Sequence, residues 1–287
     1  MLGDERTTLQ GAIDFHLHSR PDTVERISDD LDLAAQACEA NMKAIVLKAH
    51  GASTVERAYL TARIVKGIDV FGGICLNASV GGLNPEAIKR MIRLKADTPS
   101  GQRVGMVVWL PTIDAENHIA HGSPSRTPVP VRVNGDPAPG LVEILRLIGK
   151  YNLILATGHL SSEETIWIID LAKSLGVSKI IVNHPEFNVT RMSLEDQKAV
   201  AEKGAFLEHC YYPLTPVAQH VRPEEIVQSI KHVGARHCIL ASDLGQYENV
   251  RPVEGLRSFI RTLVNYGLSW DEIELMSKTN PVTLLYS

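Results

Sequence analysis

The amino-acid sequence predicts an α/β fold, a (β/α)8 TIM barrel with an extended loop after the fourth strand. Short apolar runs alternate with longer segments of helical periodicity about eight times along the chain, which is typical of strand-helix units around a parallel sheet. A chain of 287 residues suits a single barrel domain over residues 1–287, because such barrels commonly reach this length as one unit. The expected strands are Gly11–His18, Ala44–His50, Val70–Asn77, Val104–Leu110, Leu153–His159, Lys179–His184, Ala205–Cys210 and Cys238–Asp243.

Helix start signals lie between these strands. A serine followed three residues later by glutamate predicts a capping box, which satisfies backbone N–H groups where a helix begins. Pro85 and Pro223 stand at positions where the first turn of a helix tolerates proline. These signals fix the order of strand and helix in each unit. The predicted capping boxes pair Ser53 with Glu56, Ser161 with Glu164, and Ser269 with Glu272.

One connection is longer than the others. Residues 111–140, after the fourth strand, are rich in proline, glycine, serine and asparagine. Val129–Val133 followed by Asn134-Gly135 predicts a small hairpin over the barrel mouth, since Asn-Gly is a favoured hairpin turn. Long loops in compact domains are usually functional or disordered, so we interpret the segment as a lid. The alternative is a solvated insertion with no role.

Composition and charge exclude several classes of protein. With 44% hydrophobic and 22% charged residues, the chain is typical of a globular protein with a sizeable core. A formal net charge of -4, without a basic stripe, argues against nucleic acid as a partner. No apolar run approaches the roughly 20 residues of a membrane span, and the polar N-terminus lacks a signal-peptide core. We therefore expect a cytoplasmic protein with a small-molecule substrate, no nucleic-acid or membrane partner, and a homo-oligomeric state.

Histidine is concentrated at the expected strand ends. In a barrel these ends converge on one face, so residues that are distant in sequence meet there. Imidazole is a common metal ligand, and three or four nitrogen and oxygen ligands leave a position open for water. The four cysteines lack Cys-x-x-Cys spacing, which predicts reduced, mostly buried thiols rather than zinc ligands. The six of 11 histidines at strand ends are His16, His18, His50, His159, His184 and His209.

Five short segments in order along the chain carry a family resemblance. They are Ile13-Asp14-Phe15-His16-Leu17-His18, Thr157-Gly158-His159, Asn183-His184-Pro185, Ser242-Asp243 and Asn280-Pro281-Val282-Thr283-Leu284-Leu285. Together they resemble the amidohydrolase superfamily of metal-dependent hydrolases, which share a (β/α)8 barrel. The resemblance implies that His16, His18, His159 and Asp243 bind the catalytic metal. It also implies that His184 binds a second metal, or acts as a catalytic, substrate-polarising group beside a single one.

The fourth strand departs from the pattern of this family. Binuclear members carry a carboxylated lysine or a glutamate there to bridge two metals, whereas this strand reads Val107-Val108-Trp109-Leu110. On the second strand, alternation puts Lys48 and His50 on one face, which we take as the inward face. Lys48 is expected to bind a substrate carboxylate or to pair with Glu208, because a buried lysine is tolerated only when paired or functional. Bridging after carboxylation is its weaker alternative.

Several other candidates have competing interpretations. Glu208 and His209 compete for the inward position on the seventh strand, because adjacent residues of a strand face opposite sides. Trp109 either stacks on a substrate ring or fills the barrel mouth. His118 and His121 could close over substrate or bind a further metal, but we expect both to face solvent.

The chemistry of the expected site follows from its ion. We expect one or two divalent metals per chain, zinc in the first place, with manganese, iron or cobalt as alternatives. Such an ion lowers the pKa of bound water to about 7 and polarises a carbonyl group. Asp243 is expected to act as the general base and later as proton donor to the leaving group. His184 is expected to stabilise the developing oxyanion.

The leading hypothesis is a hydrolase that acts on an amide, cyclic amide or ester carbonyl of a small molecule. The alternative is a mononuclear-metal decarboxylase, because the resemblance extends to lyases with the same histidine and aspartate ligands and no fourth-strand lysine. A mononuclear deaminase is disfavoured, since Ser162 stands where its characteristic glutamate is expected. A non-catalytic barrel that binds metal structurally is the third class.

Overall fold

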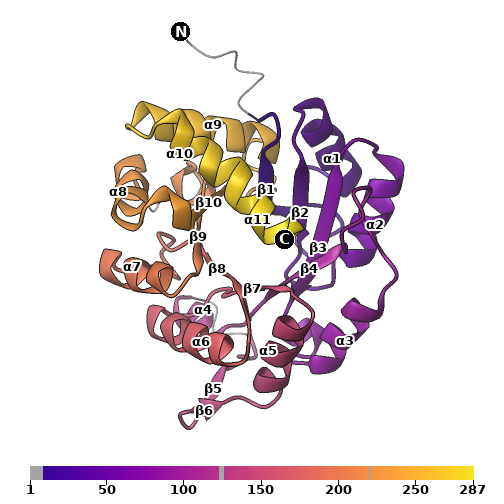
Figure 1. Ribbon diagram of the computed structural model, residues 1–287, viewed down its shortest axis with the longest axis vertical. Coiled ribbons are helices and arrows are strands. Elements are labelled where there is room, and N and C mark those ends of the chain that lie inside the picture. The colour runs from indigo at the N-terminus through magenta and orange to yellow at the C-terminus, as the bar shows by residue number, and fades with distance from the viewer. Residues whose placement is uncertain (1–8, 123–125, 220) are drawn as a thin grey trace.

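The computed structural model describes residues 9–122, 126–219 and 221–287. Eight parallel strands form one sheet in the order β1-β2-β3-β4-β7-β8-β9-β10. Helices surround this sheet (Figure 1), which confirms the predicted (β/α)8 barrel. The strands are β1 (Ile13–His18), β2 (Ala44–Lys48), β3 (Asp69–Cys75), β4 (Gly105–Trp109), β7 (Ile154–Ala156), β8 (Lys179–Asn183), β9 (Phe206–Cys210) and β10 (Cys238–Ala241).

The barrel is nearly closed between its first and last strands. The backbone N–H of Asp243 donates to the carbonyl of His16 (2.7 Å), and that of His18 donates to the carbonyl of Leu244 (2.8 Å). Asp14 adds a side-chain contact at this seam, because its Oδ1 accepts from the Ser242 N–H (3.0 Å). The seam therefore fixes Asp243 directly beside the two histidines of β1.

The helices follow the strands in the predicted alternation. A π-helical stretch, Leu275–Thr279, joins the last two of them. Within the described residues, no helix has both the length and the apolar character needed to cross a membrane. The helices are α1 (Asp30–Glu39), α2 (Val55–Ile64), α3 (Pro85–Arg93), α4 (Glu116–Ala120), α5 (Leu141–Lys150), α6 (Ser162–Ser174), α7 (Leu194–Glu202), α8 (Pro223–Val233), α9 (Pro252–Asn265), α10 (Trp270–Glu274) and α11 (Asn280–Tyr286).

Most of the helix start signals are confirmed. Capping boxes begin α6 and α10, as predicted, and Pro85 and Pro223 open α3 and α8. The third predicted box is wrong. Thr54 rather than Ser53 precedes α2, and the Ser53 hydroxyl donates to the side chain of Glu56 (3.0 Å).

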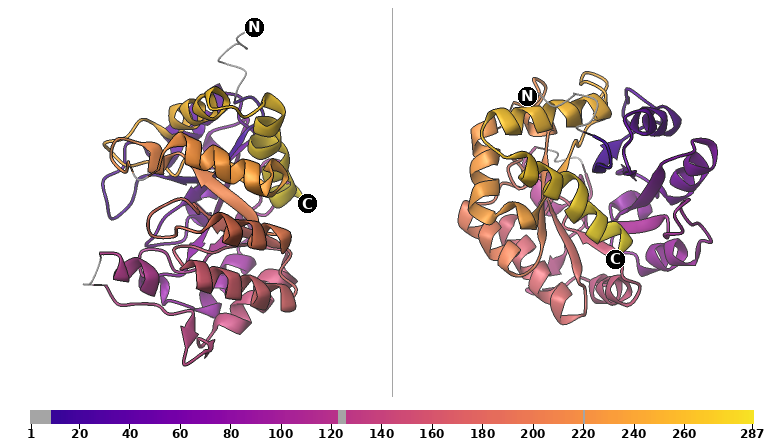
Figure 2. Two further views of the ribbon diagram at one scale, coloured as in Figure 1. Left: turned by 90° about the vertical axis from the view of Figure 1, so that its left-hand side faces the viewer. Right: turned by 45° about the horizontal axis from the view of Figure 1, so that its top comes forward.

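The core has two layers, one between the strands and the helices and one inside the barrel. Inside the barrel, Phe15, Phe71 and Trp109 are almost fully buried. Helix α11 lies across one end of the barrel (Figure 1), where Leu284 and Leu285 pack into the same interior cluster. The insertion that carries α4 lies at the opposite end (Figure 2, left). The strand ends that carry the predicted site face this second end.

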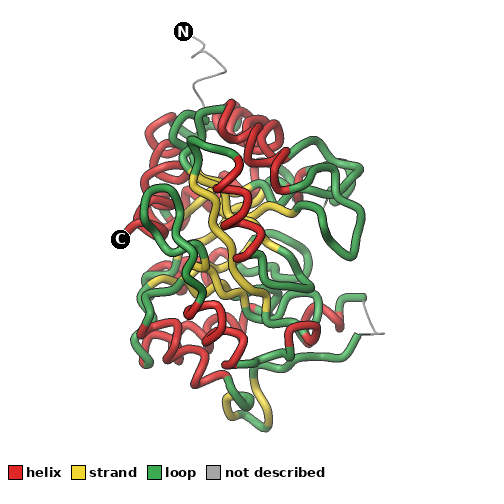
Figure 3. Tube along the Cα trace, turned by 90° about the vertical axis from the view of Figure 1, so that its right-hand side faces the viewer, coloured by secondary structure: helices red, strands yellow, loops and turns green. Residues whose placement is uncertain are grey.

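The insertion after β4 contains the predicted hairpin, formed by β5 (Arg132–Val133) and β6 (Asp136–Pro137). Its position is not the predicted one. The hairpin projects at the periphery (Figures 1 and 3), where Arg132 pairs with Glu163 (3.3 Å) and lies over the Trp167 ring (5.0 Å), both on α6. These contacts hold the hairpin beside α6, and the earlier part of the insertion, with α4, reaches the barrel mouth instead.

Candidate metal centre and active site

The ends of the barrel strands enclose a pocket of about 150 Å³. Alternation along the strands and the convergence of their C-terminal ends bring the predicted site residues of this pocket together from five different strand ends. His16 and Glu208 lie beneath the pocket and are almost fully buried. The predicted site residues that line the pocket are His18, Lys48, His50, His159, His184 and Asp243.

Asp243 joins the two histidines of β1. Its Oδ1 lies 2.9 Å from His16 Nε2 and 3.3 Å from His18 Nε2. Ligand atoms on one tetrahedral zinc ion, each at about 2.0–2.1 Å from the metal, are roughly 3.3 Å apart. His16 also donates from Nδ1 to Glu208 Oε2 (2.9 Å), and such a carboxylate contact is typical of a metal-binding histidine because it leaves Nε2 for the ion. The donor set therefore fits a zinc-type ion.

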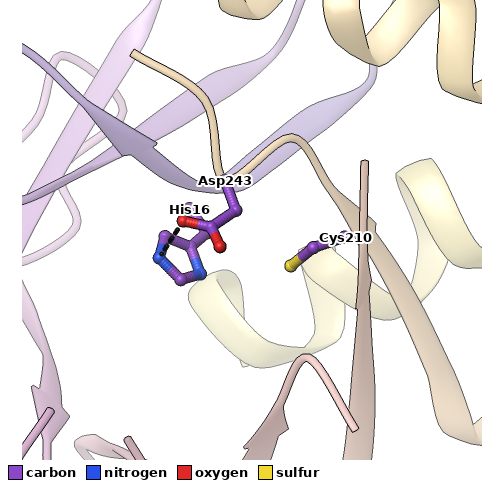
Figure 4. Close-up of side chains that lie close together, drawn as sticks. All are labelled: His16, Cys210 and Asp243. Carbon is purple, nitrogen blue, oxygen red and sulfur yellow. Dashed lines mark ion pairs between the residues drawn. The ribbon is translucent and has the colours of Figure 1, made fainter. Parts of the chain in front are cut away.

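Cys210 is a third buried group near this pair. One ligand atom each from His16, Cys210 and Asp243 lies within 4.8 Å of the others, and Figure 4 shows the thiol from the adjacent strand facing the pair. Burial raises the pKa of Cys210 well above its usual value, so it would have to lose its proton to bind a metal. The spacing of the cysteines along the chain predicted that they are not zinc ligands, but that spacing carries no information about residues that a barrel brings together from neighbouring strands.

The other pocket histidines are neutral. Burial lowers the pKa of His18 to about 3 and that of His184 to about 4. Burial also holds the pKa values of His50 and His159 well below their usual range. Neutral imidazole is the form that binds a metal, so these rings are ready to do so at neutral pH.

His16 and Asp243 behave differently, because each faces an opposite charge. Burial alone would lower the pKa of His16, but Asp243 and Glu208 raise it above its usual value. Burial alone would raise the pKa of Asp243, but His16 and His18 hold it well below its usual range. Asp243 is therefore a carboxylate at neutral pH and can accept a proton or bind a cation.

The hydrogen bonds of His184 define its tautomer. The Thr190 hydroxyl donates to the His184 carbonyl (2.8 Å) and lies 2.9 Å from His184 Nδ1. Because the hydroxyl has one proton, Nδ1 must donate, which leaves Nε2 unprotonated. His184 and Asp243 both have left-handed backbone, with φ of 29° and 52°, and such strain is concentrated at functional sites.

Lys48 has a different partner from the one predicted. The predicted charge pair between Lys48 and Glu208 is wrong, because Glu208 accepts hydrogen bonds from His16 and from Asn183 Nδ2 (2.7 Å) instead. Lys48 Nζ lies 2.8 Å from His16 Nε2 and 5.8 Å from the centre of the Trp109 ring. The ring of Trp109 belongs to the barrel interior rather than to the pocket lining. Trp109 therefore fills the barrel beneath Lys48.

The competition on β9 is resolved. Glu208 points inward, whereas His209 points outward and its Nδ1 lies 2.8 Å from Glu186 Oε1. Burial alone would lower the pKa of His209, but the Glu186 carboxylate and the neighbouring Cys238 outweigh burial and raise the pKa to about 10. His209 is thus a buried cation outside the pocket, and the prediction that it contributes to the site is wrong.

The insertion contributes a histidine that we expected to face solvent. His118, on α4, lines the pocket, and its Nδ1 lies 2.8 Å from His159 Nδ1. His121, one helical turn later, is exposed as predicted. The search for polar residues at strand ends could not identify His118, because this residue lies outside the strand-helix units. Its sequence signal was a second histidine, His121, three residues away.

Solved structures share this fold over nearly the whole chain. An amidohydrolase from Pseudomonas aeruginosa is 10% identical with a TM-score of 0.67, covering 98% of this chain and 97% of that one. A phosphotriesterase homology protein from Escherichia coli, complexed with phosphate in its active site, is 12% identical with a TM-score of 0.60, covering 96% and 99%. An N-acetyl-D-glucosamine-6-phosphate deacetylase from Mycobacterium smegmatis is 16% identical with a TM-score of 0.60, covering 96% and 76%.

The protein is therefore a (β/α)8 barrel that shares its fold with these solved structures. Within that class, the chain belongs to the family of unknown function DUF6282, whose model matches residues 11–208. No curated protein matches its sequence significantly. At these identities the solved structures establish the fold, and the chemistry must be argued from the side chains of this chain.

Proposed function

We propose that this protein is a metal-dependent hydrolase that cleaves an amide, cyclic amide or ester bond of a small molecule. The observation that carries the proposal is the contact of one Asp243 oxygen with the Nε2 atoms of both His16 and His18. His18 and Asp243 of that arrangement line the pocket, together with further neutral histidines. A carboxylate and imidazoles of this kind are the donor set of catalytic zinc sites.

His16, His18 and Asp243 would hold the metal, with His159, His184 and Cys210 as further candidate ligands. When bound, the metal would supply Lewis acidity and lower the pKa of a coordinated water. Asp243, as a carboxylate, would accept the proton released by the attacking water and later return it to the leaving group.

The tautomer of His184 changes its predicted role. With Nδ1 donating to Thr190, its Nε2 has no proton to give to an oxyanion. His184 therefore suits a metal ligand or proton acceptor. Lys48 is better suited to the developing negative charge, because its ammonium group lines the pocket and carries donors without a carboxylate partner among the described residues.

The proposal is tested by metal content and turnover on one preparation. Protein purified without chelator is measured by elemental mass spectrometry and then assayed against a panel of small amides, cyclic amides, lactones and esters. Asp243→Asn should keep the circular dichroism spectrum and lose turnover by at least about a thousandfold. Asp136→Asn, on the exposed hairpin, is the matched control. Substantial hydrolysis by Asp243→Asn would contradict the assignment.

A decarboxylase is the second candidate, and the composition of β4 favours it. The inward residue there is Trp109, so β4 supplies no carboxylate or lysine to bridge a second metal. Lys48 and Arg26 line the pocket and would face a substrate carboxylate, although Arg26 also pairs with Asp22 (2.7 Å). About one metal per chain with carbon dioxide released from small carboxylic acids would establish the lyase instead of the hydrolase.

A further inference from the structure

His118, which belongs to the insertion after β4, contacts His159, a predicted metal ligand at the end of a barrel strand. His118 Nδ1 and His159 Nδ1 are 2.8 Å apart, and the two rings are stacked with centroids 4.8 Å apart. The rings of His184 and His50 have their centroids 5.1 Å and 6.0 Å from that of His159. The outer part of the pocket is therefore a cluster of four imidazoles, one of which comes from outside the strand-helix units.

Neighbouring contacts hold α4 in this place. Asn117, the residue before His118, donates from Nδ2 to the His159 carbonyl (3.1 Å) and to the Val189 carbonyl (2.7 Å). At the beginning of the insertion, Asn77 Oδ1 accepts from the backbone N–H of Thr112 (2.8 Å). The segment that carries His118 is thus hydrogen-bonded to the loops after β3, β7 and β8. These bonds hold the His118 ring beside the His159 ring.

The two nitrogens form a hydrogen bond in the structure, and their separation is also close to that of two ligands of one ion. Two ligand nitrogens at about 2.0–2.1 Å from one metal are roughly 2.9 Å apart at a right angle and roughly 3.3 Å apart at a tetrahedral angle. The observed 2.8 Å is within a few tenths of an ångström of this range. Small rotations of the two side chains would admit an ion between them.

We infer that His118 is a metal ligand supplied by the insertion, which together with His159 binds a zinc-type divalent cation and thereby holds α4 on the barrel mouth. The inference rests on the proposed metal centre and adds to it a ligand from outside the eight strand-helix units. An ion shared by His118 and His159 would join α4 to the end of β7, so the closed position of α4 over the barrel mouth would depend on bound metal.

The test compares His118, on α4, with His121, the residue that follows this helix. Wild type, His118→Ala and His121→Ala are titrated with Zn²⁺ by equilibrium dialysis and with Co²⁺ by its visible absorption, with circular dichroism as the check on folding. His121→Ala, which removes an exposed ring, should match wild type. His118→Ala should bind one site at least about tenfold more weakly and change the Co²⁺ spectrum. Equal titration of all three proteins would overturn the inference.

Hydrogen exchange gives a second readout that does not need activity. Zn²⁺ should slow amide exchange in residues 111–121 of wild type and of His121→Ala, and should have no such effect in His118→Ala. Equal protection in His118→Ala would also overturn the inference. If wild type binds no Zn²⁺ or Co²⁺ at all, both the proposed function and the inference about His118 fail. If wild type binds metal and His118→Ala binds the metal equally well, only the inference about His118 fails.

Discussion

The outward-facing pair of His209 and Glu186 makes the stability of this barrel depend on pH. The folded state raises the pKa of His209 from 6.5 to about 10, because Glu186 and the neighbouring Cys238 outweigh the effect of burial. A raised pKa means that this contribution to stability is complete below pH 6.5 and is lost as pH rises toward 10. Between these values the folded protein holds a proton that the unfolded chain releases.

The size of the effect follows from this one proton. Each pH unit within the window should lower the free energy of unfolding by on the order of 1 kcal/mol. In Glu186→Gln the histidine loses its carboxylate partner, so the variant should be destabilised at pH 6.5 and should lose this slope. Urea unfolding at pH 6.5, 7.5 and 8.5 measures both effects, with zinc either absent or in fixed excess. The series ends at pH 8.5 because burial raises the pKa of Cys75 to about 11, which adds a second slope at higher pH.

The control for this prediction is an exposed carboxylate on a nearby helix. Glu202→Gln, at the end of α7, removes the same charge without removing a buried partner, so its unfolding free energies should run parallel to those of wild type. The reasoning would be refuted if Glu186→Gln were also parallel to wild type across the three pH values. It would mean that His209 is neutral in the folded protein.

Three further perturbations act on other parts of the molecule. Glu208→Gln weakens the acceptor of the His16 ring, so metal affinity measured by chelator competition should fall by about 10–100-fold. Thr190→Val removes the acceptor of His184 Nδ1 at nearly constant side-chain volume. Turnover should fall by about tenfold, while the midpoint of thermal unfolding changes little. Unchanged turnover would show that the tautomer of His184 has no role. Gly73→Ala should lower stability by at least about 3 kcal/mol in thermal unfolding, because its Cβ would lie 2.0 Å from a carbonyl of β4; wild-type stability would contradict the packing around Trp109.

The fold could be predicted because each strand carried its own signal. A short apolar run identified every strand of the barrel, and the structure ends most of them one to three residues earlier than expected. The residues just past these ends, such as His159 and Asp243, are those that line the pocket. The hairpin was also predictable, since Asn134 and Gly135 adopt the left-handed backbone that its turn requires. Its position was not, because the contacts with α6 are tertiary.

From the sequence, only those site residues could be predicted whose positions follow from alternation along a single strand. Alternation placed His16 and His18 together on β1, because two residues of one strand share a face. On β9 alternation showed that Glu208 and His209 face opposite ways but could not say which faces inward. Cys210 and His118 were missed for a related reason: each is brought to the site by a contact between elements, the first across neighbouring strands and the second through the fold of the insertion.

The charges around His16 explain why a metal fits the deepest part of the site. Two buried carboxylates, Glu208 and Asp243, contact the two nitrogens of one imidazole, and the Lys48 Nζ lies 2.8 Å from one of these nitrogens. Burial of two anions beside one cation is costly unless a further positive charge is near. Asp243 and Glu208 raise the pKa of His16 above its usual value in spite of burial, so this environment favours positive charge. A divalent ion at Nε2 would supply that positive charge and compete with a proton on this nitrogen, so metal affinity should fall as pH is lowered.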